Sequence, residues 1–291
     1  MNILNTIGNT PLIEIDGIYA KLETTNPTGS IKDRMATYII KMAERRGELK
    51  PNDQIIEVTS GNTGIALAMI SAIKGYKFTA VMAESMSLER RRMMEAFNAK
   101  IILTPAKDDI KGAIKKYNEL IKKYPNAYLP KQFENPDNIE AHRKGLGQEI
   151  LKQAPNIQAF VAGTGTGGTL IGTALALKKS NPNIKIIAVE PAESAVLSGK
   201  TPNLHRIQGI GEGFIPKIVQ DNLPLIDDVI TVKSIAAIKA SKLLTKKYGV
   251  LVGISSGANF LAAQSLKSKF TNIVTVFSDR GERYLTTASN L

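Results

Sequence analysis

One lysine and three turns of small residues are the parts of this sequence best suited to chemistry. Lys32 lies in the short polar segment 26–34, and the turns occupy residues 59–64, 163–169 and 253–257. Glycine lets backbone N–H groups approach an anion closely, and serine and threonine hydroxyls add further hydrogen bonds. One turn for a phosphate, one for a carboxylate and one for an aromatic ring, around a single amine, predict a pyridoxal phosphate site.

The turn at 163–168 has four glycines in six positions and satisfies the G-x-G-x-x-G spacing between a predicted strand and a predicted helix. Glu190 ends the next predicted strand, where the ribose-binding acid of a dinucleotide fold would lie. A dinucleotide fold usually carries this turn after its first strand, whereas here a complete α/β unit precedes it. The hydroxyls of Thr164, Thr166 and Thr169 also suit a phosphate monoester. A phosphate, a dinucleotide and a turn used only for packing all remain open for this segment.

The other features each have an ordinary structural explanation as well. The turn at 59–64 can receive a carboxylate or simply cap a helix. The turn at 253–257 can cap the start of a helix or place a serine hydroxyl beside a ring nitrogen. Most lysines are solvated. A lysine in a partly closed cleft, however, can have its pKa lowered enough to form a Schiff base and to carry protons.

Composition excludes several classes of site. The 291 residues include no cysteine and two histidines, so disulfides, thiolate metal sites and a histidine-rich metal centre are not expected. The longest apolar helical stretch, around residues 65–73, is interrupted and too short to cross a bilayer. We therefore expect a soluble, cytoplasmic protein without a metal site.

The net charge of +12, from 38 basic and 26 acidic residues, raises the possibility of nucleic-acid binding. The basic residues are scattered over several predicted helices, and the densest run is Arg90-Arg91-Arg92. A solvated helix face is the simpler interpretation of that run, and no nucleic-acid partner is expected. The positive field could still attract small anionic substrates.

Alternating strands and helices predict an α/β fold from about residue 55 onward. The first series has strands at 54–59, 77–83 and 100–104 and helices at 64–74, 87–97 and 108–123. A linking helix at 138–153 leads to a second series, with strands at 159–162, 184–190, 229–232 and 273–277 and helices at 168–179, 234–248 and 257–267. This order predicts two domains, each a mostly parallel twisted sheet flanked by helices, with the cofactor in the cleft between them.

The expected domains are a smaller, mobile one at 37–140, with the substrate-carboxylate loop, and a larger one formed by 1–36 plus 141–291, with the cofactor phosphate loop. The segment 191–224 is long and rich in glycine and proline, which is typical of a functional loop.

Several ordered motifs carry a family resemblance that runs from Gly8 to Leu285. They are Gly8-Asn9-Thr10-Pro11-Leu12, Glu84-Ser85-Met86-Ser87, Gln132-Phe133-Glu134-Asn135-Pro136, Glu190-Pro191, His205-Arg206-Ile207-Gln208-Gly209-Ile210-Gly211 and Gly281-Glu282-Arg283-Tyr284-Leu285. With the turns above, they make the chain resemble the cysteine synthase (O-acetylserine sulfhydrylase) family of the tryptophan-synthase-β-like, fold type II pyridoxal phosphate enzymes.

The resemblance implies a role for each matching position. Lys32 would form the imine with pyridoxal 5′-phosphate and act as the catalytic base. Asn62 would bind the 3′-hydroxyl of the cofactor, and Ser255 would face its ring nitrogen. The residues that would hold the phosphate are Gly165, Thr166, Gly167, Gly168 and Thr169. Those that would bind the substrate are Thr59, Ser60, Gly61, Asn62, Thr63 and Gln132, with Gly209, Ile210 and Gly211 on the opposite wall.

The implied reaction is β-replacement: O-acetyl-L-serine and sulfide give L-cysteine and acetate through an aminoacrylate intermediate. A cystathionine β-synthase that uses homocysteine is the nearest alternative, and a threonine or serine dehydratase is a more distant one. An NAD-dependent dehydrogenase is an alternative of another class, which rests on the turn at 163–168 alone. The resemblance also implies a homodimer, and serine acetyltransferase as a possible partner whose carboxyl terminus would occupy the substrate site.

Two departures from the family pattern leave details open. Gly145-Leu146 replaces a pair of threonines that many relatives carry, and Glu212 follows Gly211 where a small residue is common. Glu212 leaves the sulfur nucleophile open, and the sequence does not separate an acetyl from a phosphoryl leaving group.

Overall fold

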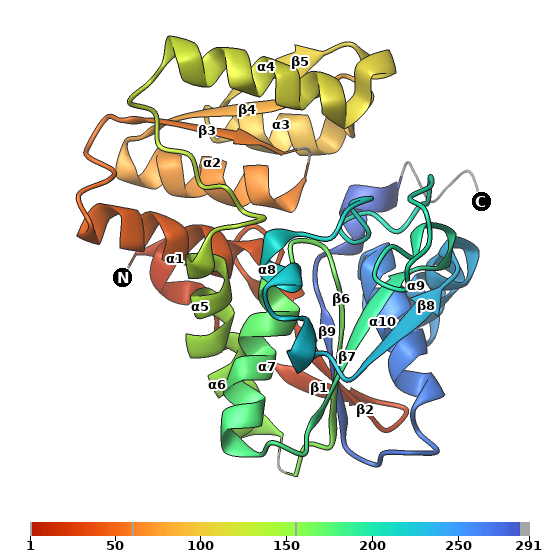
Figure 1. Cartoon of the computed structure of the whole chain (residues 1–291). Coiled ribbons are helices and arrows are strands. Elements are labelled where there is room, and N and C mark those ends of the chain that lie inside the picture. The colour runs from red at the N-terminus through yellow and green to blue at the C-terminus, as the bar shows by residue number, and fades with distance from the viewer. Residues whose placement is uncertain (1, 60, 155, 286–291) are drawn as a thin grey trace. The chain divides into compact units, whose positions relative to one another are not determined.

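The computed structural model describes residues 2–59, 61–154 and 156–285, which form two compact units (Figure 1). Unit 1 contains Lys32–Gln132 together with the residues up to Asn5, and unit 2 contains Thr6–Ile31 and the residues from Phe133 onward. The sequence-based boundaries were 36/37 and 140/141. They would cut through helix α1 (Lys32–Arg45) and helix α5 (Pro136–Lys144), each of which packs as a whole, α1 against α2 and α5 against α7.

Unit 1 is built on a three-stranded parallel sheet with the order β3-β4-β5. Its strands are β3 (Gln54–Val58), β4 (Lys77–Ala83) and β5 (Lys100–Thr104), and its further helices are α2 (Asn62–Lys74), α3 (Leu88–Ala96), α4 (Asp109–Lys123) and the 3₁₀ helix η3 (Ala106–Asp108). Figure 1 shows α4 on one face of the sheet and α2 on the other. Ile56, Val81, Ala113 and Leu120 form the core between the sheet and α4.

A polar cluster ties the end of α1 to the end of α2 within unit 1. Glu44 accepts hydrogen bonds from Lys74 Nζ (2.9 Å) and from the hydroxyl of Tyr76 (2.5 Å). Burial opposes the charge on Glu44, but these two hydrogen bonds outweigh burial and hold the pKa of Glu44 below its ordinary value. Burial and the same hydrogen bond raise the pKa of Tyr76.

Unit 2 has a six-stranded sheet with the order β1-β2-β9-β6-β7-β8, in which β1 and β2 form an antiparallel hairpin and all other pairs are parallel. Its strands are β1 (Leu12–Ile15), β2 (Ile18–Leu22), β6 (Ala159–Gly163), β7 (Lys185–Pro191), β8 (Asp228–Val232) and β9 (Ile273–Phe277). Its helices are α5, α6 (Leu146–Gln153), α7 (Gly168–Ser180), α8 (Lys217–Gln220), α9 (Ser234–Tyr248) and α10 (Ile254–Ser265). Its short 3₁₀ helices are η2 (Glu23–Thr25), η4 (Ala192–Ser194), η5 (Leu223–Leu225) and η6 (Gly281–Tyr284), and the chain first passes from unit 1 to unit 2 at the end of η1 (Ile3–Thr6).

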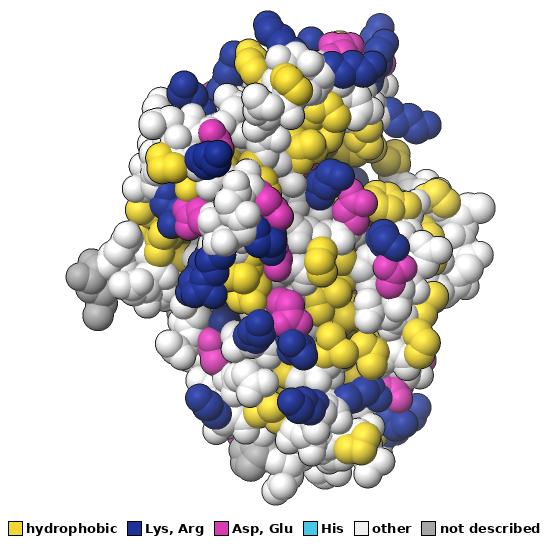
Figure 2. Space-filling view, turned by 60° about the vertical axis from the view of Figure 1, so that its left-hand side comes forward, with side chains coloured by type: hydrophobic (Ala, Val, Ile, Leu, Met, Phe, Trp, Pro, Cys, Tyr) yellow, Lys and Arg dark blue, Asp and Glu magenta, His cyan; other side chains and the backbone are white. Residues whose placement is uncertain are grey.

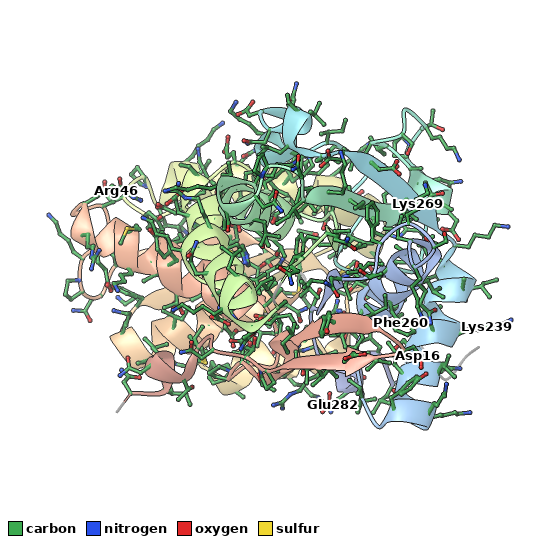
Figure 3. All side chains as sticks on the ribbon, turned by 90° about the horizontal axis from the view of Figure 1, so that it is seen from below. Asp16, Arg46, Lys239, Phe260, Lys269 and Glu282 are labelled. Carbon is green, nitrogen blue, oxygen red and sulfur yellow. The ribbon has the colours of Figure 1, made fainter. Side chains whose placement is uncertain are left out.

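Alternate residues of the unit 2 strands supply two hydrophobic cores, one on each face of the sheet. On β7, Ile187 and Val189 belong to the core under α9 and α10, whereas Ile186 and Ala188 belong to the core under α6 and α7. Phe260, labelled in Figure 3, joins α10 to β9 through an edge-to-face contact with Phe277 at 6.4 Å between ring centroids.

The α/β class, with parallel-rich sheets in two units, confirms the predicted fold. Three local differences stand out. The β1–β2 hairpin and helix α1 were not predicted, the helix expected at 138–153 is broken at Gly145 into α5 and α6, and α10 begins at Ile254 rather than at residue 257. No helix within the described ranges has both the length and the apolar character that a membrane span needs.

Candidate active site

The predicted carboxylate loop joins β3 to α2 in unit 1. Thr59 continues the sheet, because its backbone N–H donates to Val81 O at 3.1 Å. Its hydroxyl accepts the backbone N–H groups of Gly64 (3.0 Å) and Gly61 (3.4 Å), which folds the loop tightly around the Thr59 side chain. Ser60, also predicted to bind substrate, lies outside the described residues. The Thr59 hydroxyl therefore shapes the turn.

The structure brings together two further predicted substrate residues that are 69 positions apart. The hydroxyl of Thr63 donates to Gln132 Oε1 at 2.7 Å, and the two residues are 3% and 6% exposed. This bond uses Gln132 Oε1 as the acceptor and so fixes the orientation of the Gln132 carboxamide. Asn62 and Thr63 occupy the first turn of α2, where backbone N–H groups have no acceptor within the helix. The loop therefore offers the donors that a carboxylate requires.

Lys32 is the first residue of α1 and is half-buried, whereas the sequence placed it in a polar segment outside any helix. The segment before it is fixed within unit 2. Arg283 donates to the carbonyl oxygens of Thr28 and Gly29, and Ile31 N donates to Ser278 O at 2.9 Å. The lysine thus begins unit 1 immediately after a segment that unit 2 holds rigidly.

A buried polar network beneath the same segment was missed by sequence reasoning. Lys21 is fully buried on β2, and its ammonium group contacts Glu149 Oε2 at 2.7 Å and the Thr10 carbonyl. Thr10 Oγ1 donates to Glu23 Oε1 at 2.7 Å, and Asn26 Nδ2 donates to Glu23 Oε2 at 2.8 Å. Asn26 opens the segment that leads to Lys32. The available signal was a lysine within a strand whose other residues are Ile, Tyr, Ala and Leu.

The predicted phosphate loop joins β6 to α7 in unit 2, and helix α5 packs closely against it. Gly167 has a positive φ of 88°. A Cβ atom on Gly168 would lie 1.9 Å from Asn138 Oδ1, so α5 packs directly against the start of α7. Asn138 Nδ2 donates to Thr166 Oγ1 at 3.0 Å, and His142 Nε2 lies 3.4 Å from Thr169 Oγ1. Sequence reasoning missed both α5 residues, because only the folded contact marks them.

The predicted wall at 209–211 lies against this loop. Gly211 N donates to Thr164 O at 3.0 Å, and a Cβ atom on Gly165 would lie 2.4 Å from Gly209 O. A Cβ atom on Gly163 would lie 2.7 Å from a methyl carbon of Ile210. His205 Nε2 donates to Gly211 O at 2.8 Å and fixes the far end of the wall. The glycines of the loop therefore make room for segment 209–211.

Ser255 lies in the first turn of α10 and is buried. On the same helix, Asn259 Nδ2 donates to Val276 O at 2.8 Å, and its Oδ1 atom would lie 3.2 Å from a Cβ atom on Gly163. Asn259 Oδ1 and Thr164 Oγ1 are buried polar atoms for which the described part of the chain supplies no partner. These orphaned groups, beside the amino end of the 13-residue helix α7, fit a bound phosphate ester and ring.

Two alternative functions lose support from the same structure. Glu190, the ribose-binding acid of the dinucleotide interpretation, is buried and accepts the backbone N–H groups of Leu197 (2.8 Å) and Ser198 (3.0 Å). In the part of the described surface that Figure 2 shows, Lys and Arg side chains lie in small groups among Asp and Glu side chains. Arg90 corrects the prediction of a solvated helix face, because it is 6% exposed. No group of three or more His, Cys, Asp or Glu side chains that could hold a metal occurs within the described ranges.

Comparison with known proteins identifies the family. The family model described as "pyridoxal-phosphate dependent enzyme" matches residues 3–279 of the chain. A cysteine synthase from Staphylococcus aureus is 47% identical over 299 aligned positions, covering 98% of this chain and 96% of the relative. The crystal structure of a cysteine synthase from Entamoeba histolytica has a TM-score of 0.95 at 41% identity, covering 100% of this chain and 90% of that one.

The structure of an O-acetylserine dependent cystathionine β-synthase from Helicobacter pylori has a TM-score of 0.92 at 40% identity, covering 98% of this chain and 97% of that one. The residues that fit a phosphate ester and a ring thus lie in a chain that matches this family over nearly its full length. The chain belongs to the family of pyridoxal-phosphate dependent enzymes.

Proposed function

We propose that this chain makes L-cysteine and acetate from O-acetyl-L-serine and sulfide by β-replacement. The observation that carries the proposal is the Thr63–Gln132 hydrogen bond beside the first turn of α2, in a chain that is 47% identical to a cysteine synthase. This arrangement suits an amino-acid carboxylate. The phosphate loop at 163–169 would hold the cofactor, with Ser255 at its ring nitrogen and Asn62 at its 3′-hydroxyl.

Pyridoxal phosphate, when bound, takes up the negative charge that develops at the α-carbon of the substrate. The chain supplies the rest. The loop at 59–63 and Gln132 orient the carboxylate, and the Lys32 amine takes the proton from the α-carbon as acetate leaves the β-carbon. Hydrosulfide then adds at the β-carbon, and Lys32 returns the proton to the α-carbon. Because Ser255 is neutral, it leaves the ring a weaker acceptor of charge than a carboxylate partner would, which favours departure of acetate over other fates.

The direct test is the formation of cysteine from O-acetylserine and sulfide, measured by chromatography. Borohydride reduction of the purified protein followed by peptide mass spectrometry should place a pyridoxyl group on Lys32. The variant Lys32→Ala should fold but lose turnover and the reducible visible band. Substantial turnover by that variant, or a pyridoxyl group on another lysine, would refute the role assigned to Lys32.

A second candidate is the synthesis of cystathionine, with homocysteine as the nucleophile. The Helicobacter pylori enzyme favours it, because that relative matches nearly the whole chain. Glu212 is exposed between Gly211 and Gly213 and follows the predicted substrate wall, and we propose that it influences the choice of nucleophile. Parallel assays with sulfide and homocysteine, each with O-acetylserine and O-phosphoserine, decide both the nucleophile and the leaving group.

The assembly is part of the proposal. We expect a homodimer, to be checked by size-exclusion chromatography with light scattering. We also expect the carboxyl terminus of serine acetyltransferase to bind at 59–63, because a chain terminus carries the carboxylate that this loop would recognise. A terminal peptide of that enzyme should compete with O-acetylserine, and the same peptide with an amidated end should not. The cytoplasmic location remains a prediction.

A further inference from the structure

One face of helix α3 packs against the turn that begins α2. Arg90 and Met94 are both buried and stand four positions apart, so they share this face. A Cβ atom on Gly64 would lie 2.6 Å from Met94 Sδ, and a Cβ atom on Gly61 would lie 3.9 Å from Arg90 Nη1. The Met94 contact holds this face of α3 against the start of α2. The guanidinium group of Arg90 is thereby placed beside the carboxylate loop.

This position is unusual for an arginine. Arg90 is 6% exposed, whereas Arg92, two positions along, is exposed. Ser87 is the N-cap residue of α3, and its hydroxyl accepts a hydrogen bond from Arg90 N at 3.5 Å. This bond holds in place the first turn of the helix, which carries Arg90. Removing a guanidinium group from water is costly, and a nearby anion offsets part of that cost. The positive charge lies within the same unit as Thr63 and Gln132.

From this geometry we infer that Arg90 is a positioning residue that makes the loop at 59–63 select substrates with an ionised α-carboxylate. The inference rests on the proposed function. Arg90 acts through the Gly61 turn, where it adds a permanent positive charge to the partial charge at the amino end of α2. Electrostatic interactions are stronger in such a shielded site than in water. The Thr63–Gln132 hydrogen bond and the neutral backbone donors at the start of α2 give the geometry, and Arg90 gives the preference for charge.

A purely structural role for Arg90 is the competing explanation. Glu57, on β3, is another buried charged residue of unit 1, at 5% exposed, and Arg90 could serve only to balance it. In that case, variants of Arg90 would lose stability and would treat charged and uncharged substrates alike. The ratio of rates for two such substrates therefore separates the explanations.

The experiment compares O-acetyl-L-serine with its methyl ester, which lacks the carboxylate charge, using the cofactor-loaded enzyme and sulfide. For Arg90→Gln, kcat/KM with O-acetylserine should fall about 10- to 100-fold, mainly through KM, because a charge–charge attraction over several ångströms near a protein surface is of this size. The methyl ester should change less than about threefold. Arg90→Lys keeps the charge and should recover part of the loss. Arg91→Gln is the matched control, because Arg91 is a neighbouring arginine on the same helix that contacts Met86 O at 2.9 Å.

Each outcome has a distinct meaning. A selective loss for O-acetylserine in Arg90→Gln, with partial recovery in Arg90→Lys and no selectivity in Arg91→Gln, supports the inference. Equal losses for both substrates, or no loss for either, overturn it. If Arg90→Gln does not fold, two other measurements decide: the substrate selectivity of Arg90→Lys and the salt dependence of KM in the wild type. A KM for O-acetylserine that does not change with salt overturns the inference. Failure of the wild type to make cysteine would instead refute the proposed function.

Discussion

Replacing Gly168 by alanine should disrupt the phosphate loop by displacing the side chain of Asn138 on α5. The new Cβ atom would lie 1.9, 2.4 and 2.8 Å from the Oδ1, Cγ and Nδ2 atoms of Asn138. All three distances are shorter than real side-chain contacts allow, so the carboxamide must move away. Asn138 is 1% exposed and donates to Thr166 Oγ1 at 3.0 Å. The movement therefore breaks a buried hydrogen bond that supports the loop.

The free energy of unfolding should fall by about 2 to 3 kcal/mol. Overpacking a core position typically costs about 1 to 3 kcal/mol, and a lost buried hydrogen bond adds about 1 kcal/mol. The better helix propensity of alanine returns less than about 1 kcal/mol at the first position of α7. For a unit of this size the melting temperature should fall by about 4 to 12 °C. The cofactor should also be released more readily, because the displaced carboxamide no longer holds Thr166.

A double-variant cycle with Asn138→Ala tests the cause. Asn138→Ala removes the three clashing atoms, so adding Gly168→Ala to it should cost less than about 1 kcal/mol, which gives a coupling near 2 kcal/mol. Urea unfolding followed by circular dichroism, with the visible cofactor band as a second signal, supplies the free energies. Gly172→Ala is the matched control, because its Cβ atom would lie 2.3 Å from the backbone oxygen of Ile139 and truncation of Asn138 cannot relieve that clash. If Gly168→Ala costs as much in the Asn138→Ala background as in the wild type, the reasoning is wrong.

Two further substitutions test unit 1. Thr63→Val removes the hydroxyl that bonds Gln132 and should raise KM for O-acetylserine about tenfold without changing the cofactor spectrum, whereas Thr63→Ser should restore it; an unchanged KM would contradict the substrate role. Glu44→Gln should lower the melting temperature at pH 7 by about 2 to 4 °C, since it weakens the bonds to Lys74 and Tyr76. The folded-state pKa of Glu44 is lowered, so its contribution is present above the unfolded-state pKa and is lost as pH falls through the folded-state value. Melting curves that differ equally at pH 7 and at an acid pH well below the ordinary range of glutamate pKa values would contradict this assignment.

The strand-to-helix turns could be predicted from the sequence because their chemistry is local. Gly165 and Gly168 are visible in the sequence as glycines, and the fold needs them because a Cβ atom would meet the Gly209 carbonyl oxygen at the first and the Asn138 carboxamide at the second. The turn at 59–64 likewise follows from a strand, small polar residues and an apolar helix in succession. What the sequence missed at these turns was their extent. Helix α2 begins at Asn62 and α10 at Ile254, two and three residues before their predicted starts. The prediction missed these first turns because polar residues there show no periodic pattern and cannot be told from a preceding loop.

Other features could not be predicted because they depend on contacts between distant segments. Lys21 looks like a solvated strand residue until Glu149, on α6, is packed against it. Asn138 becomes a support for the phosphate loop only once α5 lies against α7. In both cases a buried polar side chain is paired with a residue far away in the sequence: more than a hundred positions for Lys21 and nearly thirty for Asn138. A single sequence carries no trace of such a pairing.

Arg90 shows why a run of like charges has to be resolved residue by residue. Successive helix positions point about 100° apart, so three consecutive arginines span about 200° of the helix surface, and one of them can fall on the packed side. Which of the three turns inward depends on the rotation of α3, and Met94 sets that rotation by filling the space beside Gly64. The absence of a side chain on Gly64 thus brings Met94 close, and Met94 brings Arg90 to Gly61. If this chain of contacts holds, Met94→Ala should loosen the placement of Arg90 and reduce the discrimination between O-acetylserine and its methyl ester, although Met94 carries no charge. An unchanged discrimination in Met94→Ala would show that other contacts fix the rotation of the helix.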